Sequence, residues 1–319
     1  MAEYEHINDF DLEIWYEELD EFVPAKIFDT HVHLWDNKYC HTPTTWLDTN
    51  FETLDKFSKK IFPNREIGYQ ILATPIVGVN LDAYNQFMAA EIAKSPHKIG
   101  SSIVTPQMTP EYLNNVINKY HFTGLKPYRL YAQDPANCYI LDYLPENLIE
   151  VANTHKLNIT LHMSRFNGIG DEKNLSDLQY LTKKYPNVRW ILAHCARAFN
   201  SYTLEKNVFV LKDIPNIYYD LSAVCDARSH FLLFKHENIN RIMFGTDNID
   251  AGGVHGKYIT WGKGWQYFSG ANVPHCKKDV TFVCYESLRS IKQAADMAGL
   301  NTSDIEKIFY RNAENFFNL

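Results

Sequence analysis

The chain has 319 residues, of which 45% are hydrophobic, and it carries a formal net charge of −7 at pH 7. This content is ample for the core of one large domain, and an acidic chain lacks the basic face that nucleic-acid partners usually require. No run of about 18 apolar residues occurs, so we predict no membrane-spanning helix and no membrane partner.

The first 25 residues are acidic and lack the basic and apolar segments of a secretory signal. We predict that residues 1–25 form a helical N-terminal extension. The six cysteines are scattered without a CxxC pair, a usage that suits free thiols in a reducing compartment, and we therefore expect a cytoplasmic protein.

Short apolar runs rich in β-branched residues follow, with amphipathic segments between several of them. They begin between 23 and 41 residues apart, and a strand, a crossover helix and two loops need about 25–35 residues. The pattern predicts an α/β protein, with residues 26–319 forming a single (β/α)8 TIM barrel. The predicted strands are 26–32, 67–73, 99–105, 122–127, 157–163, 188–194, 216–221 and 240–246.

Two segments, 34–54 and 248–275, are long for loops of such a barrel. Both follow strands and should lie on the carboxyl-terminal face, where barrel enzymes build their active sites. The second is rich in glycine and aromatic residues, which fits either a wall of the substrate site or a plain surface insertion. After it, the C-terminal tail reads as an amphipathic closing helix with a capping box at Ser303 and Glu306.

Polar residues able to bind a metal end several of the predicted strands. In DTHVH the alternation of a strand puts His31 and His33 on one face, where two imidazoles can chelate one ion. An HxH pair alone is weak evidence, but His162, His194 and Asp247 end three further strands. Buried His and Asp need partners, and a shared cation supplies them. We predict one divalent ion on His31, His33, His162 and Asp247, with His194 and Asp247 as catalytic residues; zinc is the expected ion and manganese the alternative.

The motifs DTHVHLW, ITLHMS, ILAHCA, MFGTDN and IFYRNAENFF resemble those of the amidohydrolase superfamily. The resemblance is to the amidohydrolase-2 branch, which includes aminocarboxymuconate-semialdehyde decarboxylase, and it covers the chain from about residue 26. It implies the same four metal ligands and a catalytic role for His194 outside the ligand set. In binuclear members a carbamylated lysine ends the fourth strand, where this chain has Lys126; substrate contact or a structural role is the alternative.

Three arginines stand at like positions, each three residues after a residue that ends a predicted strand. Together with Lys126 we interpret them as substrate-binding residues, because guanidinium groups match carboxylates in a two-pronged geometry. Ion pairs with nearby acids are the competing explanation for each. The three are Arg129, Arg165 and Arg197. Four aromatic residues could wall an apolar ring or simply pack: Trp35, Tyr128, Trp261 and Trp265.

These residues predict a metal-dependent hydrolase in which metal-activated water attacks an amide, lactone or ester carbonyl of a small, anionic substrate. A metal-dependent, non-oxidative decarboxylase is the first alternative, because the same metal site serves both reactions. A non-catalytic binding barrel with a vestigial site is the second. The sequence leaves open whether the chain forms homo-oligomers.

Overall fold

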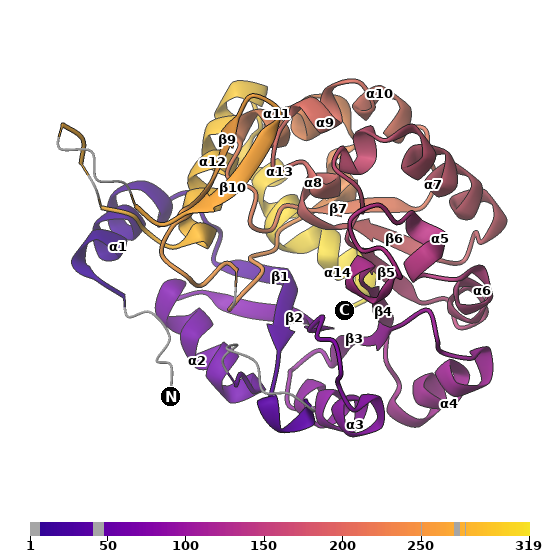
Figure 1. Cartoon of the computed structure of the whole chain (residues 1–319). Helices are drawn as coiled ribbons and strands as arrows, with labels where there is room; N and C mark the ends of the chain where they lie inside the picture. The colour runs from indigo at the N-terminus through magenta and orange to yellow at the C-terminus, as the bar shows by residue number, and fades with distance from the viewer. Residues whose placement is uncertain (1–6, 41–47, 250, 271–274, 278) are drawn as a thin grey trace.

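The computed structural model describes residues 7–40, 48–249, 251–270, 275–277 and 279–319. Eight parallel strands in the order β1 to β8 form a nearly closed barrel with helices between them, which confirms the predicted (β/α)8 fold (Figure 1). The barrel strands are β1 (Lys26–Leu34), β2 (Glu66–Ala73), β3 (Ile99–Val104), β4 (Gly124–Pro127), β5 (Asn158–Leu161), β6 (Arg189–Leu192), β7 (Ile217–Asp220) and β8 (Ile242–Met243).

Longer helices surround the strands (Figure 1). They are α2 (Phe51–Ile61), α3 (Leu81–Ile92), α4 (Pro110–Tyr120), α6 (Glu146–Thr154), α7 (Glu172–Lys184), α11 (Ala227–His236) and α12 (Val283–Ala298). Shorter helical turns are α1 (Asp9–Ile14), η1 (Trp15–Leu19), η2 (Asn37–Tyr39), η3 (Arg129–Tyr131), α5 (Ile140–Tyr143), η4 (Gly168–Gly170), α8 (Ala193–Arg197), α9 (Tyr202–Glu205), α10 (Val208–Leu211), η5 (Ile239–Arg241), α13 (Thr302–Glu306), η6 (Lys307–Arg311) and α14 (Asn312–Phe317). Within the described ranges, no helix is both long and apolar enough to cross a bilayer.

The barrel closes where β1 meets the segment that follows β8. Strand β8 is only two residues long, but the pairing continues beyond it, because the Thr30 amide donates to the Phe244 carbonyl over 3.0 Å. Farther along, the Asp247 amide donates to the His31 carbonyl, and the His33 amide donates to the Asn248 carbonyl, each over 2.8 Å. These bonds place Asp247 directly beside both histidines of β1.

The opposite end of the barrel is filled by apolar side chains. Phe28 of β1 stacks on Phe317 of α14 with ring centroids 5.3 Å apart, and Met243 and Phe316 belong to the same buried cluster. The C-terminus consequently lies near the middle of the barrel in Figure 1.

The predicted capping box at Ser303 and Glu306 was wrong. The observed capping box of the closing helix lies two residues earlier. The side chain of Asn301 accepts from the amide of Asp304, and the side chain of Asp304 accepts from the amide of Asn301. An Asn cap with an acidic residue three positions on satisfies the same two amides that a Ser and Glu pair would.

The N-terminal segment contains α1 and η1 and packs on the barrel. Trp15 is fully buried against Phe62 and Tyr285, with ring centroids 5.8 and 5.7 Å away. Asp11 accepts from the Thr281 hydroxyl over 2.6 Å and pairs with His255 over 2.8 Å. The segment is thereby bound to the second long insertion through His255 and to the residues just before α12 through Thr281.

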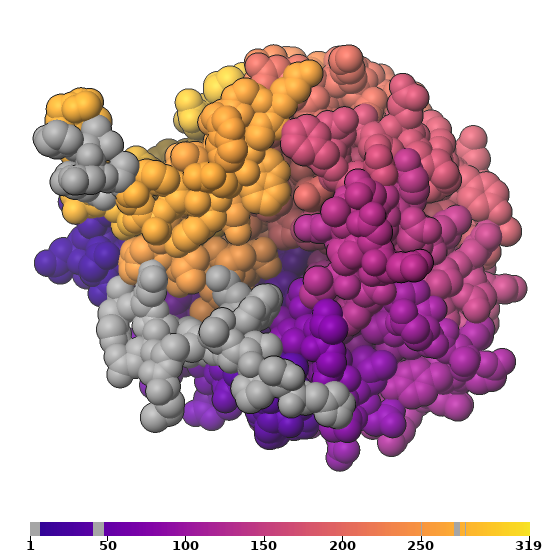
Figure 2. Space-filling view, in the orientation of Figure 1, coloured from indigo at the N-terminus to yellow at the C-terminus, as the bar shows by residue number. Residues whose placement is uncertain are grey.

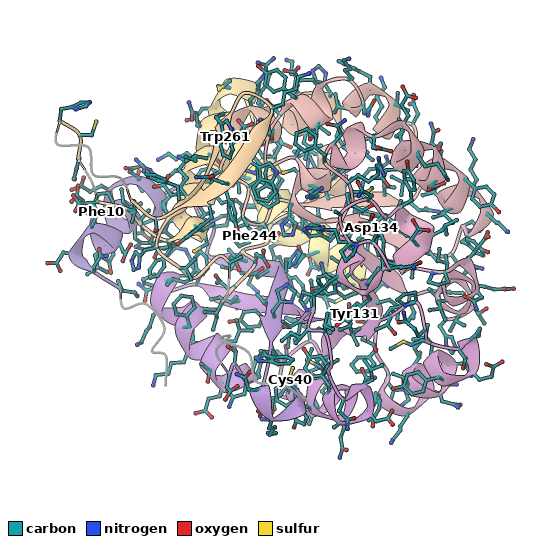
Figure 3. The ribbon with its side chains drawn as sticks, viewed as in Figure 1. Phe10, Cys40, Tyr131, Asp134, Phe244 and Trp261 are labelled. Carbon is teal, nitrogen blue, oxygen red and sulfur yellow. The ribbon has the colours of Figure 1, made fainter. Side chains whose placement is uncertain are left out.

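The second insertion contains an antiparallel hairpin, β9 (Lys257–Trp261) and β10 (Gly264–Phe268), in place of a structureless loop. It lies on the viewer's side of the molecule (Figure 2), with Trp261 near its end (Figure 3). Trp265 stacks on Phe199 at 4.3 Å, and the Asn200 amide group donates to the carbonyls of Gly262 and Gly264. The hairpin therefore sits on the segment that follows β6.

Candidate metal centre and active site

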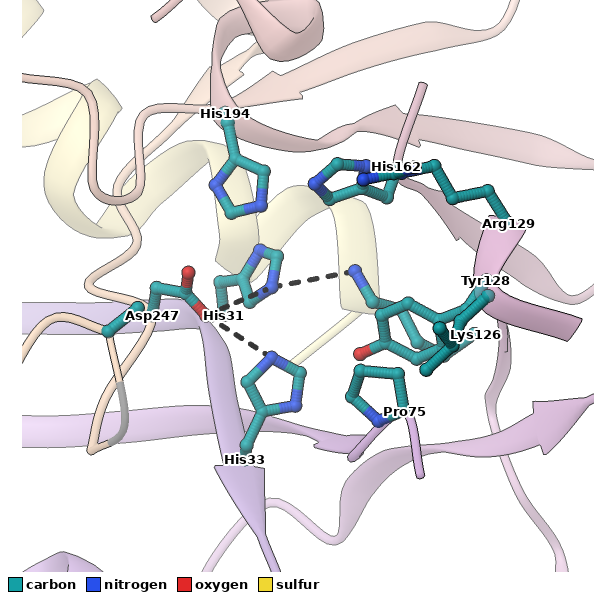
Figure 4. A pocket seen from close by; sticks show the side chains of 11 residues that line it. His31, His33, Pro75, Lys126, Tyr128, Arg129, His162, His194 and Asp247 are labelled. Carbon is teal, nitrogen blue, oxygen red and sulfur yellow. Dashed lines mark hydrogen bonds and ion pairs between the residues drawn. The ribbon is translucent and has the colours of Figure 1, made fainter. Parts of the chain in front are cut away.

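A cavity of about 300 Å³ opens at the carboxyl-terminal end of the strands (Figure 4). Side chains that end β1, β4, β5 and β6 meet there with residues from the loops after β2, β4 and β8. The lining residues are His31, His33, Pro75, Lys126, Tyr128, Arg129, Leu130, His162, His194, Asp247 and Ala251. The four predicted metal ligands and His194 are thus brought to one cavity.

Asp247 and the two histidines of β1 form the tightest part of this arrangement. Asp247 Oδ1 lies 3.2 Å from His33 Nε2 and 3.6 Å from His31 Nε2, and the ligand atoms of the three residues lie within 4.8 Å of one another. The His162 and His194 rings come from the neighbouring strand ends, with centroids 5.1 Å apart, and His194 lies 4.8 Å from His31.

The four imidazoles share an orientation that their hydrogen-bond partners fix. Nδ1 faces the Leu72 carbonyl in His33, the Met163 carbonyl in His162, the Ser222 carbonyl in His194 and the Asp220 carboxylate in His31. A carbonyl or an ionised carboxylate only accepts, so each Nδ1 carries the hydrogen and each Nε2 keeps a lone pair. This tautomer is the one that binds metals through Nε2.

These residues fit a divalent ion. Lone pairs of His31 and His33 approach a carboxylate oxygen of Asp247, and acceptors this close repel one another unless a proton or a cation lies between them. Imidazole nitrogen with carboxylate oxygen is a donor set typical of zinc and also suits manganese through its carboxylate. His162 lines the same cavity and would complete the predicted set.

A register irregularity in β1 shapes the site. Asp29 pairs with Tyr69 and Val32 with Ile71, so two residues of β1 face one of β2 between these pairs. Such bulges re-aim neighbouring side chains. Asp29 does not line the cavity with the histidines but accepts from the amide and hydroxyl of Thr246 over 2.9 and 2.5 Å.

The turn that carries His194 has an unusual backbone. Four successive residues without glycine, from His194 to Arg197, have φ between +54° and +63°. A left-handed turn costs roughly 1–2 kcal/mol per L-residue. The Ala198 amide closes the turn on the His194 carbonyl at 2.9 Å, and the His194 amide donates to Asp220 Oδ1 at 3.0 Å. Strained backbone of this kind collects at functional sites.

Asp220 and Ser222 are functional candidates that sequence reasoning missed. Both are fully buried at the end of β7, and neither lines the cavity. Asp220 contacts the His31 ring and the His194 amide, and Ser222 contacts the rings of both histidines. The signal was present in the sequence, since YYDLS ends the seventh predicted strand with polar residues, as the fifth, sixth and eighth strands end.

The family model described as amidohydrolase matches residues 28–319. The chain belongs to the amidohydrolase family. A comparison with curated proteins found no match.

Solved structures with the same fold include enzymes of two reaction types. One is a 2,6-dihydroxybenzoate decarboxylase bound to 2,6-dihydroxybenzoate (TM-score 0.59, 14% identity, 93% of this chain and 100% of that chain). Another is a probable 2-pyrone-4,6-dicarboxylic acid hydrolase from Acinetobacter baumannii with citric acid bound (TM-score 0.56, 13% identity, 92% of this chain and 99% of that chain). A third is a 5-carboxyvanillate decarboxylase from Novosphingobium aromaticivorans with manganese and 4-hydroxy-3-methoxy-5-nitrobenzoic acid (TM-score 0.54, 13% identity, 92% of this chain and 96% of that chain). At these identities the likeness concerns the fold.

Several ionisable groups in the cavity of this amidohydrolase have strongly shifted pKa values. Burial lowers the pKa of Lys126 to about 8, and burial together with the charge of Lys126 lowers the pKa of His31 to about 3. Burial would raise the pKa of Asp247, but the neighbouring histidines outweigh it and hold that pKa below its usual range. The histidine is therefore neutral and the carboxylate ionised near neutral pH, as metal binding requires.

The three arginines of the amidohydrolase are placed differently. Arg129 lines the cavity and donates to the Pro135 carbonyl over 2.7 Å. Arg165 is held by Asp171 at 2.9 Å and by the Asn137 carbonyl at 2.7 Å, and it does not line the cavity. Arg197 is largely buried and donates to the Arg165 carbonyl through Nη1, while its Nε has no hydrogen-bond partner among the described residues.

The aromatic candidates divide in the same way. Tyr128 lines the cavity, with the Lys126 ammonium 5.1 Å from its ring centre. Trp35 is buried and packs edge-on against Tyr84 away from the cavity, and Trp261 is largely exposed. Trp265 does not line the cavity; it stacks on Phe199, whose ring centroid lies 5.3 Å from that of His194.

Proposed function

We propose that this amidohydrolase hydrolyses an amide, lactone or ester bond of a small carboxylate-bearing substrate, using one divalent ion held by His31, His33, His162 and Asp247. The observation that carries the proposal is the convergence of imidazole Nε2 atoms and one ionised carboxylate on a single small cavity. Zinc is the ion we expect from this donor set, and manganese, which one neighbour contains, is the alternative.

A bound ion of this kind lowers the pKa of coordinated water and polarises a carbonyl oxygen. The chain supplies the proton transfers. His194 has its Nδ1 hydrogen bound by the Ser222 carbonyl, so its Nε2 can take a proton from the attacking water and return it to the leaving oxygen or nitrogen. Asp247, whose carboxylate is ionised at neutral pH, is the second group that we propose as a proton acceptor.

The opposite wall of the cavity is cationic. Lys126 is completely buried, with Nζ 3.5 Å from His31 Nε2, and Arg129 lies near the opening. Charge-assisted hydrogen bonds from these groups would hold a substrate carboxylate and leave its reacting carbonyl beside the histidines. Arg197 does not line the cavity, and its buried Nε would reach the same anion only after the side chain moves. We assign Arg165 a lesser part, since its guanidinium already has acceptors.

A non-oxidative decarboxylase is the second candidate. Two of the structural neighbours described above are decarboxylases of aromatic acids, and a decarboxylase substrate also carries the carboxylate that Lys126 and Arg129 would bind. Among the described residues, the lining contains one phenol ring, Tyr128, beside four imidazoles and the cationic side chains of Lys126 and Arg129. This composition favours proton transfer to and from water over the stacking of a large aromatic ring.

Isotope labelling separates the two reactions. The metal-loaded protein is incubated with a panel of lactones, amides and aromatic acids in water enriched in oxygen-18. A hydrolase incorporates the label into a new carboxylate and releases no CO2, whereas a decarboxylase releases CO2 and forms no labelled carboxylate. CO2 release from any member of the panel without label incorporation would overturn the hydrolase proposal. A metal-loaded protein inert towards the whole panel would support a binding barrel.

A further inference from the structure

Asp220 sits at the centre of a buried hydrogen-bond network behind the cavity. One carboxylate oxygen lies 2.9 Å from His31 Nδ1, and the other accepts from the His194 amide over 3.0 Å and from the Ser222 amide over 3.1 Å. The side chain has no solvent exposure and is not among the lining residues. Its contacts are therefore with the groups that face the cavity, and not with anything inside the cavity.

Ser222 joins the two histidines to this carboxylate. Its hydroxyl donates to Asp220 Oδ1 over 2.5 Å, and its oxygen lies 3.2 Å from His31 Nδ1 and 2.9 Å from His194 Nδ1. Because the hydroxyl hydrogen is used by Asp220, the oxygen can only accept from the two rings. Both Nδ1 atoms then keep their hydrogens, and both Nε2 atoms keep lone pairs towards the cavity.

His31 lies between two carboxylates, and the distances decide which one receives its hydrogen. Nδ1 is 2.9 Å from Asp220, within hydrogen-bond range, whereas Nε2 is 3.6 Å from Asp247, outside it. The Asp220 side of the ring is a satisfied hydrogen bond, and the Asp247 side presents two acceptors. Asp220 consequently turns the metal-binding lone pair of His31 towards Asp247.

The same carboxylate also holds the backbone of the left-handed turn. Its bond to the His194 amide anchors the first of the four residues with positive φ, and that residue carries the imidazole whose Nε2 faces the cavity. Without this anchor the turn loses the acceptor that compensates its unfavourable conformation at that residue.

We propose that Asp220 is a positioning residue that fixes the tautomer and direction of His31 and the backbone position of His194, and so controls metal affinity from outside the cavity. The inference rests on the proposed function only for the identity of the metal ligands. Carboxylates that orient ligating histidines typically change metal affinity by about 10- to 100-fold when they are removed.

The test is Asp220→Asn, which preserves the size of the side chain. Its amide group would donate to His31 Nδ1, and the ring would have to carry its hydrogen on Nε2, where it blocks the metal. We expect zinc affinity, measured by competition with a chromogenic chelator, to fall by about 10- to 100-fold. Nitrogen-15 shifts of the His31 ring in the metal-free protein, assigned with His31→Gln, should report a change from the Nδ1–H to the Nε2–H tautomer.

Glu237→Gln is the matched control. Glu237 is a buried carboxylate away from the cavity, and it accepts from the hydroxyl of Tyr219, the neighbour of Asp220 in β7, over 2.9 Å. It should leave zinc affinity and the His31 tautomer unchanged. If Asp220→Asn does not fold, the His31 tautomer is read in the metal-free wild-type protein, where the proposal requires the Nδ1–H form because Asp220 accepts that hydrogen.

Unchanged zinc affinity together with an unchanged His31 tautomer in Asp220→Asn overturns the proposal, as does the Nε2–H tautomer in the metal-free wild-type protein. The tautomer is measured without metal or substrate. A wild-type protein that fails to bind metal or to hydrolyse anything would thus refute the proposed function, while the ring shifts would still decide whether Asp220 sets the His31 tautomer.

Discussion

The cavity has two walls that are built differently. On the wall formed by β1, β6 and β7, the back of each ring is tied to a buried acceptor, so His31 and His194 are held from behind by Asp220 and Ser222. On the wall formed by β4 and its loop, Lys126 contacts His31 at 3.5 Å and Arg129 is held by one loop carbonyl. The first wall is preorganised for chemistry, and the second can adjust to a ligand.

The largest effect should come from removing a proposed metal ligand from the first wall. Asp247→Asn removes the carboxylate charge that faces His31 and His33, so we expect loss of bound metal and of detectable turnover. Chelator treatment of the wild-type protein should reproduce the loss, and added zinc or manganese should restore activity to the wild type alone. Metal at 100 times its dissociation constant should also raise wild-type stability by about 2.7 kcal/mol, seen as a higher Tm. Full activity in chelated protein would contradict the metal site.

His194→Ala tests the same wall at a residue outside the proposed set of metal ligands. We expect turnover to fall by on the order of 10²–10⁴, because the proton carrier is lost, while metal content stays near normal. Both quantities are measured on one preparation, by steady-state kinetics and elemental analysis. Loss of the metal in this variant would make His194 a ligand and would favour a binuclear site with a modified Lys126.

The second wall should respond in binding more than in chemistry. Charged hydrogen bonds contribute ~1.5–3 kcal/mol each, so Arg129→Met should raise KM about 10- to 150-fold and leave the metal bound. Arg165→Met is the matched control, since that guanidinium is committed to Asp171 and the Asn137 carbonyl. Equal KM effects in the two variants would show that the cavity lining does not define the substrate site.

The smallest effect concerns the outer support of the insertion, remote from both walls. Burial alone would raise the pKa of Asp11, but hydrogen bonds from His255, Asn8 and Thr281 together outweigh it and lower that pKa below its ordinary value of 3.8. The unfolded chain takes up this proton first, so the stability contribution is present above pH 3.8 and is lost as the pH falls through the folded-state pKa. Asp11→Asn should flatten the acid side of the Tm profile and leave metal affinity unchanged.

The sequence was sufficient for the barrel and for the side chains that end its strands, because strand spacing and strand-end polarity are local patterns. The Asp220 and Ser222 network could have been found by the rule that selected Asp247. The hairpin was also encoded, since KYITW and WQYF flank a turn beginning with Gly262, but its glycines favoured a loop interpretation.

Two features lay beyond such patterns. The left-handed turn after β6 contains no glycine, and its conformation depends on contacts to β7, 26 residues away in the case of the His194 amide and Asp220. Likewise, which arginine would reach the cavity depends on loop paths: Arg165 and Arg197 have the same spacing from their strands as Arg129, yet Arg129 lines the cavity. Side-chain partners of this kind are tertiary information.

The seam between β1 and the segment after β8 determines when, during synthesis and folding, the proposed metal site can form. The proposed ligands His31, His33 and Asp247 meet across this seam, and more than 200 residues must be synthesised and folded into the barrel between the first and the last of them. A nascent chain emerging from the ribosome would therefore lack the complete proposed site until the segment after β8 has been synthesised. Loop closure over such a separation is slow, and an ion bound by these residues would stabilise the closed barrel.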